Sequence, residues 1–224
     1  MNLKGKKILV VVGHPDDEAI CCGGLIMKAK KEKAKVFVMY MATGDSRQFM
    51  NGETKQADRI EEVIAASEYG GFDYDICLPN ISTKLDTVAQ KELIEVVEDK
   101  VKEFKPDIVI IPYTESYNQD HRAVATACIT ALRPIPQELH HQPEMILEME
   151  EPYSWPNAFN PNFYVDITDF LPEKMNLYKK HASQIPQNIK HSRSIVTLMM
   201  TASVRGTQIG VGEAEAYKLL KGQM

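Results

Sequence analysis

The sequence predicts a doubly wound α/β fold, in a single domain over residues 1–224, and three observations support this. Apolar runs alternate with amphipathic stretches of helical length through the first 132 residues. Within each run the apolar residues are consecutive, which is typical of parallel strands covered by helices on both faces. At 224 residues the chain is also long enough to bury one sizeable core and short enough for one domain.

The first half of the chain provides four strands that alternate with four helices. The run KKILVVV at residues 6–12 is the first predicted strand. The third predicted helix carries apolar residues at the helical spacing of Leu93, Val96, Val97 and Val101. We predict strands over residues 6–12, 34–43, 74–79 and 106–113. We predict helices over residues 16–33, 54–69, 88–104 and 120–132.

The second half is less regular, and its elements are predicted from shorter patterns. EMILEME (residues 144–150) and NFYVDIT (162–168) are predicted strands, and residues 169–181 and 213–221 are predicted helices. A loop rich in proline and asparagine, EPYSWPNAFNP, separates the two strands. Its Trp155 is a candidate for stacking on a sugar ring, with an ordinary packed loop as the alternative.

Composition and charge exclude several classes of function. The 26 basic and 31 acidic residues give a net charge of −5, which argues against nucleic acid or an anionic membrane as the main partner. No run approaches 18 consecutive apolar residues, so we expect no membrane span. Four cysteines without paired C-x-x-C spacing indicate reduced thiols, so we expect a cytoplasmic protein. A homo-oligomer is compatible with the sequence, which does not specify one.

A histidine and three acidic residues follow the first predicted strand directly, in the motif HPDDE. In an open parallel sheet, ligands bind beyond the carboxyl ends of the strands. An acidic first helical turn also has a purely structural explanation, because carboxylates there face the positive end of the helix dipole. That explanation does not account for His14, which lies three residues before Asp17 and can converge with it on one point. The motif therefore favours a metal site.

A second polar motif, NQDH, follows the fourth predicted strand and opens the next helix. If the first and fourth strands are neighbours, His121 can complete a His/Asp/His set with His14 and Asp17. Three protein ligands with an open position describe a catalytic rather than a structural zinc site. Taken singly, Asp120 is explained as a helix cap and His121 as a surface histidine. Their joint placement favours a site.

These residues resemble the LmbE-like, or PIG-L, family of zinc-dependent N-acetylglucosamine deacetylases. HPDDE and the later DH pair carry the resemblance, with ADRIEEVIAAS, YKKHASQ and RGTQIGVGEAEAYKLL as supporting matches. The resemblance implies a Rossmann-like fold and a metal held by His14, Asp17 and His121. It also implies that Asp16 is the general base, whereas the residues alone leave open which aspartate is base and which is ligand.

Three further residues belong to the predicted site. The resemblance implies that Arg59 contacts substrate, although an arginine on an amphipathic helix is by default a solvated charge. His181, in the HASQ motif, is a candidate substrate contact, with a core or interface histidine as the alternative. Asp120 is assigned to the catalytic group together with Asp16.

The sequence departs from the family pattern at Asn118. The family usually carries a histidine at this position, three residues before the last ligand. Asparagine can donate a hydrogen bond to an oxyanion, but it cannot exchange a proton. We therefore place Asn118 in the catalytic group, with a residue that only turns the loop as the alternative.

The predicted function is removal of the acetyl group from an N-acetylglucosamine-type amino sugar or its conjugate. A bound Zn²⁺ lowers the pKa of its water to about 7, and Asp16 can take the proton of that water and pass it to nitrogen. Fe²⁺ or another divalent metal is compatible with the same ligands. A non-haem Fe(II) oxygenase is one alternative, because its triad is also two histidines and one carboxylate. A metal- or sugar-binding homologue with impaired catalysis is the other.

Overall fold

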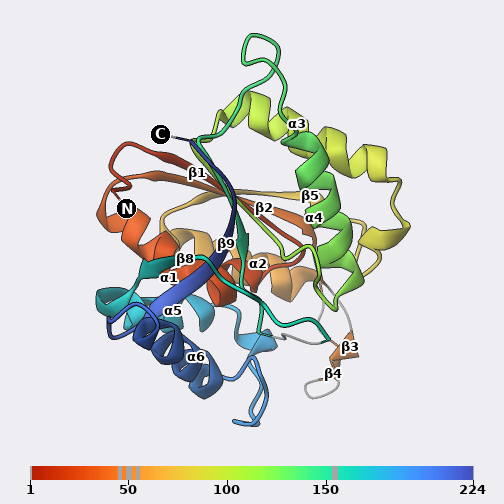
Figure 1. Cartoon of the computed structure of the whole chain (residues 1–224). Coiled ribbons are helices and arrows are strands. Elements are labelled where there is room, and N and C mark those ends of the chain that lie inside the picture. The colour runs from red at the N-terminus through yellow and green to blue at the C-terminus, as the bar shows by residue number, and fades with distance from the viewer. Residues whose placement is uncertain (1, 45–46, 49–51, 54–55, 153–155, 224) are drawn as a thin grey trace.

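A seven-stranded mixed sheet forms the centre of the computed structural model, with the strand order β5-β2-β1-β6-β7-β9-β8 (Figure 1). The structure describes residues 2–44, 47–48, 52–53, 56–152 and 156–223. The strands of the sheet are β1 (Lys7–Val12), β2 (Lys35–Ala42), β5 (Asp73–Leu78), β6 (Ile108–Ile111), β7 (Met145–Met149), β8 (Phe163–Asp166) and β9 (Ala214–Gly222). A separate pair of two-residue strands, β3 (Arg47–Gln48) and β4 (Gly52–Glu53), lies between β2 and the second helix along the chain.

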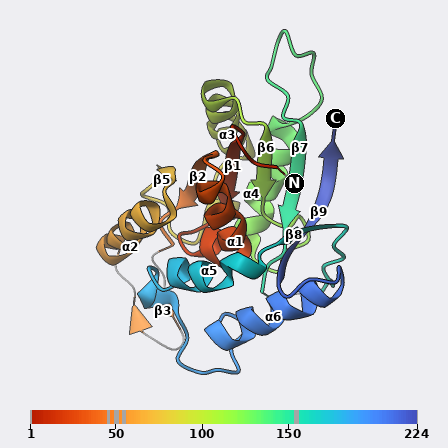
Figure 2. The same cartoon turned by 90° about the vertical axis from the view of Figure 1, so that its left-hand side faces the viewer.

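Six α-helices connect or cover these strands. They are α1 (Asp17–Lys31), α2 (Gln56–Gly70), α3 (Gln90–Phe104), α4 (Gln119–Ala131), α5 (Leu171–Tyr178) and α6 (Ile195–Thr207). Three short 3₁₀ turns complete the described elements, namely η1 (Leu85–Thr87), η2 (Thr168–Phe170) and η3 (Ala182–Gln184). The helices α3 and α4 cover one face of the sheet, and α1, α2, α5 and α6 cover the other (Figure 1, Figure 2).

The central strand β1 shows why a continuous apolar run is needed here. Its residues Ile8 and Val10 pack into the core beneath α1 and α5, whereas Leu9 and Val11 pack into the core beneath α3 and α4. Successive side chains of a strand point to opposite faces, so a strand with helices on both sides must be apolar at every position. The predicted doubly wound α/β class is confirmed by this arrangement.

The strand order reverses between β1 and β6. From β1 the chain proceeds outward through β2 to β5, then returns to place β6 on the other side of β1 and continues to β7. β1 pairs in parallel with β6, with Ile8 opposite Ile108 and Val10 opposite Ile110. The condition set for the metal site, that these two strands are neighbours, is therefore met. A reversal of this kind opens a crevice at the carboxyl ends of the two strands.

The sequence prediction was wrong at the end of the chain. Residues 213–221, predicted as a helix, lie almost entirely in β9, which pairs antiparallel with both β7 and β8. The segment is rich in Ala, Glu, Leu and Lys, which favour helices when tertiary contacts are absent. Here, two neighbouring strands satisfy the backbone of β9, and this pairing outweighs the intrinsic preference. The helix α6 was not predicted at all.

The sequence analysis expects reduced cysteine thiols and no membrane span, and the structure bears on both expectations. All four cysteines, Cys21, Cys22, Cys77 and Cys128, are free thiols. Among the described residues, no helix combines the length and apolarity that a membrane crossing requires. The location of the protein in the cell remains a prediction.

Candidate active site

Three of the predicted site residues converge at the carboxyl ends of β1 and β6. His14 lies in the turn between β1 and α1, Asp17 is the first residue of α1, and His121 lies in the first turn of α4. One potential ligand atom from each lies within 4.8 Å of the others. The Oδ2 atom of Asp17 lies 3.2 Å from Nε2 of His121 and 3.9 Å from Nδ1 of His14. The local sequence around the turn supports this geometry, because the backbone N–H of His14 donates to the same Asp17 oxygen at 2.9 Å.

Gly13 allows the two strand ends to come this close. A Cβ atom on residue 13 would lie 2.8 Å from the imidazole Cδ2 of His121. That separation is shorter than two carbon atoms tolerate, so any larger residue would displace the ring. The glycine before the HPDDE motif is therefore part of the site.

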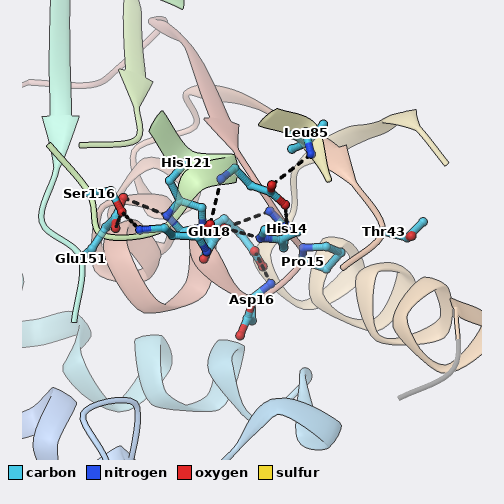
Figure 3. Close-up of polar contacts among 12 residues, drawn as sticks. His14, Pro15, Asp16, Glu18, Thr43, Leu85, Ser116, His121 and Glu151 are labelled. Atoms are coloured by element: carbon cyan, nitrogen blue, oxygen red, sulfur yellow. Dashed lines mark hydrogen bonds and ion pairs between the residues drawn. The ribbon is translucent and has the colours of Figure 1, made fainter. Parts of the chain in front are cut away.

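Each imidazole has a carboxylate partner on the side away from Asp17. The Nε2 atom of His14 lies 2.8 Å from Oδ2 of Asp120, and Nδ1 of His121 lies 2.9 Å from Oε1 of Glu151 (Figure 3). Each of these carboxylates faces one ring nitrogen, and the second nitrogen of each ring lies on the side of Asp17. The pattern is the one in which metal-binding histidines are oriented by outer carboxylates.

The outer carboxylates are themselves held in place. Asp120 is fully buried, and its Oδ1 atom accepts the backbone N–H of Leu85 at 3.0 Å. Glu151 is also buried, and its Oε2 atom accepts the Ser116 hydroxyl at 2.5 Å. The two rings are thus oriented by groups that have little freedom to move.

The charges around the two histidines suit a cation. Burial raises the pKa of Asp17, but the neighbouring His121 and His14 outweigh burial and hold that pKa well below its usual range. Burial also lowers the pKa of His121, while Asp17 and Glu151 raise it well above its ordinary value. Three carboxylates therefore surround two imidazoles, with Asp120 as the third. Two nitrogens and a carboxylate oxygen in such an anionic setting fit Zn²⁺ or another divalent metal ion.

Asp16 has a strained backbone that several distant groups support. Its φ of 111° lies in the left-handed region, which non-glycine residues rarely occupy. Its backbone N–H donates to Oε2 of Glu18 at 3.1 Å, and its carboxylate pairs with Arg59 at 3.4 Å and Arg193 at 3.1 Å. Strain of this kind persists where the surroundings over-determine the conformation, and it is concentrated at functional sites.

The environment of Asp16 also changes its acidity. Burial raises the pKa of this carboxyl above its ordinary value, although the Arg59 guanidinium opposes the shift and Arg193 adds to that opposition. A carboxylate with a raised pKa is a better proton acceptor at neutral pH. Asp16 therefore combines a fixed orientation with increased basicity.

These groups line a cavity of about 130 Å³ at the carboxyl ends of β1 and β6, which we call the strand-end cavity. Its wall is formed by His14, Asp16, Asp17, Ile20, Gly44, Arg59, Thr83, Tyr117, Asn118, His121, Glu151, Pro152, Gln184 and Arg193. Arg59 is almost fully buried, with 2% of its surface exposed, so it is not a solvated surface charge. It donates to the carbonyl oxygens of Thr43 and Pro15 as well as to Asp16.

Asn118 lies at the N-terminus of α4, in two roles at once. Its Oδ1 atom accepts the backbone N–H of Asp120 at 2.9 Å, so it is the N-cap of the helix. It also lines the strand-end cavity. The contact of the Asn118 Oδ1 atom is therefore the one expected of a residue that only turns the loop. This contact does not involve the amide nitrogen of the same side chain.

Two predicted residues lie behind the cavity rather than in its wall. His181 is fully buried, and its Nε2 atom lies 2.6 Å from Oε1 of Glu18. In this conformation it has no surface with which to touch a substrate, and it acts on the site through Glu18, which supports Asp16. Asp120 likewise lies outside the cavity lining and acts through His14. Both side chains are fully buried and lie outside the cavity wall.

Sequence reasoning missed Glu151 and Arg193, and it gave Glu18 no role beyond its place in the HPDDE motif. Glu151 follows β7 directly, so the rule that led to the HPDDE and NQDH motifs, polar residues after a buried strand, also applied to it. No comparable signal exists for Arg193, which precedes α6 and reaches Asp16 across 177 residues of sequence. Trp155, the proposed stacking residue, lies outside the described residues.

Residues 9–132 match the family model described as PIG-L, GlcNAc-PI de-N-acetylase. This match covers more than half of the chain. The chain belongs to the PIG-L family. The resemblance seen in the sequence is thereby confirmed, and the matched residues include both strand-end motifs.

Several curated relatives of this PIG-L family chain are named as deacetylases. The uncharacterised deacetylase YaiS of Escherichia coli is 30% identical, over 80% of this chain and 92% of the relative. A diacetylchitobiose deacetylase of Thermococcus kodakarensis is 26% identical, over 82% of this chain and 72% of the relative. Among solved structures, GalB, a 4-carboxy-2-hydroxymuconate hydratase of Pseudomonas putida, superposes with a TM-score of 0.80 over 98% of each chain, at 19% identity. This last likeness concerns the fold alone.

Proposed function

We propose that the chain is a zinc-dependent N-deacetylase that acts on an N-acetylglucosamine-type amino sugar or its conjugate. The observation that supports this most strongly is the convergence of His14, Asp17 and His121 beside the strained, buried Asp16. Membership of a family of de-N-acetylases and the named activities of the relatives support the choice of substrate.

In this proposal His14, Asp17 and His121 hold the metal, with Asp120 and Glu151 fixing the two imidazole rings. When bound, the metal supplies Lewis-acid polarisation of the amide carbonyl and lowers the pKa of the attacking water. Asp17, whose pKa lies below its usual range, provides the negative charge that a divalent cation needs. Fe²⁺ remains compatible with the same three ligands.

Asp16 is proposed as the general base. Its carboxylate takes a proton from the attacking water and later gives it to the sugar nitrogen as the C–N bond breaks. The products are acetate and the free amine. Arg59 and Arg193 hold the Asp16 carboxylate in one orientation, and Glu18 holds its backbone. General-base catalysis of this kind contributes roughly 10²- to 10⁴-fold in rate.

Asn118 and Arg59 are proposed to contact the substrate. The amide nitrogen of Asn118 would donate to the former carbonyl oxygen, where negative charge develops. Asn118 cannot deliver a proton, so protonation of the leaving amine depends on Asp16 alone. Arg59 lines the cavity and would interact with the sugar while it holds Asp16.

Experiments must separate the proposed deacetylase from two other activities, those of an Fe(II) oxygenase and of a hydratase, and from a protein that only binds. An Fe(II) oxygenase would use the same two histidines and one carboxylate. The likeness to a hydratase shows that this fold also carries a reaction other than deacetylation. A binding protein with impaired catalysis is the third possibility, because Asn118 replaces the histidine that is usual in the family.

Acetate release separates these possibilities. Protein loaded with Zn²⁺ is incubated with N,N′-diacetylchitobiose and with methyl N-acetylglucosaminide, and acetate and free amine are quantified together. The proposal requires equal amounts of both products and their loss in Asp16→Asn protein of equal metal content. Oxygen consumption by Fe²⁺-loaded protein would instead support the oxygenase. Sugar binding without acetate release would support the binding protein.

A further inference from the structure

The helix α6 lies on the outside of the molecule and packs against β9 and α5 with one face only (Figure 2). That inner face carries Leu198, Ala202 and Gly206, all of them buried. The opposite face is exposed along the whole helix, and we call its residues the α6 face. They are Val196, Met199, Met200, Thr201, Ser203, Val204, Thr207 and Gln208.

The α6 face is the most apolar part of the described surface. Eleven large hydrophobic residues are exposed in the part of the chain that the structure describes, and six of them lie between residues 189 and 209. Ile189 and Ile209 flank the two ends of α6. The other four follow the helical spacing that places side chains in one stripe, and they are Val196, Met199, Met200 and Val204.

The α6 face also carries no charged residue. The helix contains one charged side chain, Arg205, which pairs with Glu150. The helix α3 has the opposite character, because all its exposed residues are charged. These are Lys91, Glu92, Glu95, Asp99, Lys102 and Glu103. A helix that is apolar on both faces is typical of a buried position, so the α6 face is expected to be covered.

A second copy of the chain is the partner that this face fits. An uncharged face gives no preference for an acidic or a basic partner. Across a two-fold axis the same face of each copy meets itself, so no complementary patch is needed elsewhere. The remaining exposed large hydrophobics of the described chain lie on separate elements and form no second patch. They are Ile64, Tyr117, Ile129, Leu139 and Leu220.

The extent of the patch agrees with a dimer. Six residues that are between 40% and 66% exposed amount to on the order of 500 Å² of largely apolar surface, which is at the upper end for a monomeric protein. A stable complex buries about 800 Å² on each partner, and homodimer contacts are the more apolar ones. The polar residues of the α6 face enlarge the contact toward that area.

We propose that the chain forms a homodimer in which the α6 faces of two copies pack together across a two-fold axis. Met200 is 64% exposed near the middle of the helix, so it lies close to this axis and meets its own copy. The inference goes beyond the proposed deacetylase function and does not depend on it, because the α6 face contains no residue of the candidate site.

Light scattering coupled to size-exclusion chromatography measures the mass of the assembly. The wild type should contain an even number of chains, because a two-fold contact joins them in pairs. Met200→Glu and Met200→Arg each place like charges on the two sides of the axis, and each should halve the mass. An equal mixture of the two variants brings opposite charges together and should restore the wild-type mass.

Ile129→Glu is the matched control, because it introduces the same charge at a 46% exposed isoleucine of α4 and should keep the wild-type mass. Circular dichroism confirms that each variant is folded. A monomeric wild type, or wild-type mass in both Met200 variants, would overturn the proposal. So would a mixture that does not recover the mass. A monomeric wild type that sediments with phosphatidylcholine vesicles would assign the α6 face to a lipid surface instead.

Discussion

The two loops that build the candidate site are held in different ways. The loop after β6 leads into an ordinary helix start, in which Asn118 caps α4 and Asp120 and His121 occupy the first turn. The loop after β1 contains Asp16 with a φ of 111°, and the N-cap position there makes no side-chain capping hydrogen bond. Its conformation depends instead on Arg59 and Arg193, from distant parts of the chain.

The loop after β6 is therefore the locally encoded half of the site, because neighbouring residues fix its conformation. The loop after β1 is the supported half, because residues far away in the sequence fix its conformation. A helix cap depends on residues two or three positions apart, so it forms wherever the helix forms. A strained residue costs of order 1–3 kcal/mol and requires support from elsewhere. Asp16, the proposed base, lies in the supported half, and proton transfer requires a well-oriented carboxylate. Five predictions test this division, from the largest expected effect to the smallest.

His121→Ala tests whether the two loops form one metal site. Removing one of three ligands should abolish stoichiometric zinc binding, measured by elemental analysis of the dialysed protein, while circular dichroism stays close to wild type. His140→Ala, in the loop before β7, is the matched control and should keep full metal content. Full zinc content in His121→Ala protein would show that the loop after β6 contributes no ligand.

Asp16→Asn tests the supported half. The substitution keeps the shape of the side chain and removes the proton-accepting charge. We expect kcat to fall by roughly 10²- to 10⁴-fold with metal content unchanged. Turnover near wild type would show that Asp16 is not the base. Loss of the metal would show that the roles of Asp16 and Asp17 are exchanged.

Asn118 tests the locally encoded half, because its two roles can be separated. Asn118→Ala removes both the cap and the amide donor, and should cost about 1 kcal/mol of stability and roughly 10²- to 10³-fold in kcat. Asn118→Ser keeps a capping oxygen and should restore stability but not kcat. Thermal unfolding and steady-state kinetics measure the two effects. Unchanged kcat in both variants would leave Asn118 as a helix cap and nothing more.

Asp120→Asn tests the link between the loops, since a residue of the second loop orients His14 of the first. Loss of an outer carboxylate typically lowers metal affinity about 10- to 100-fold. Glu151→Gln, which faces His121, should have an effect of the same size. Competition with a zinc chelator gives both affinities. Wild-type affinity in both variants would mean that the two rings need no outer support.

Arg193→Met tests the long-range support of Asp16 with the smallest expected change. Loss of one of the two guanidinium groups should lower kcat about tenfold, or roughly 1.4 kcal/mol, with KM little changed. Arg193→Lys should recover part of the rate, because the positive charge returns. Lys190→Met, at an exposed position nearby, is the control. A KM effect without a kcat effect would make Arg193 a substrate contact instead.

Much of the fold and the location of the site could be read directly from the sequence. Buried parallel strands need consecutive apolar residues, so β1 and β6 were evident, and polar motifs that follow such strands must lie at one edge of the sheet. His14, His121 and the two aspartates of HPDDE were located in this way, each close in sequence to the end of a strand, and the family resemblance then assigned Asp17 as the ligand. Local patterns of this kind can be recognised without knowledge of the tertiary fold.

Only the tertiary structure decided the rest, because the deciding contacts join residues far apart along the chain. His181 meets Glu18 across 163 positions and is buried as a result, which no local pattern around HASQ could indicate. The helix-favouring residues of β9 form a strand because β7 and β8 pair with it on both sides. The sequence by itself determined which residues stand at the strand ends, and long-range packing decided what supports them.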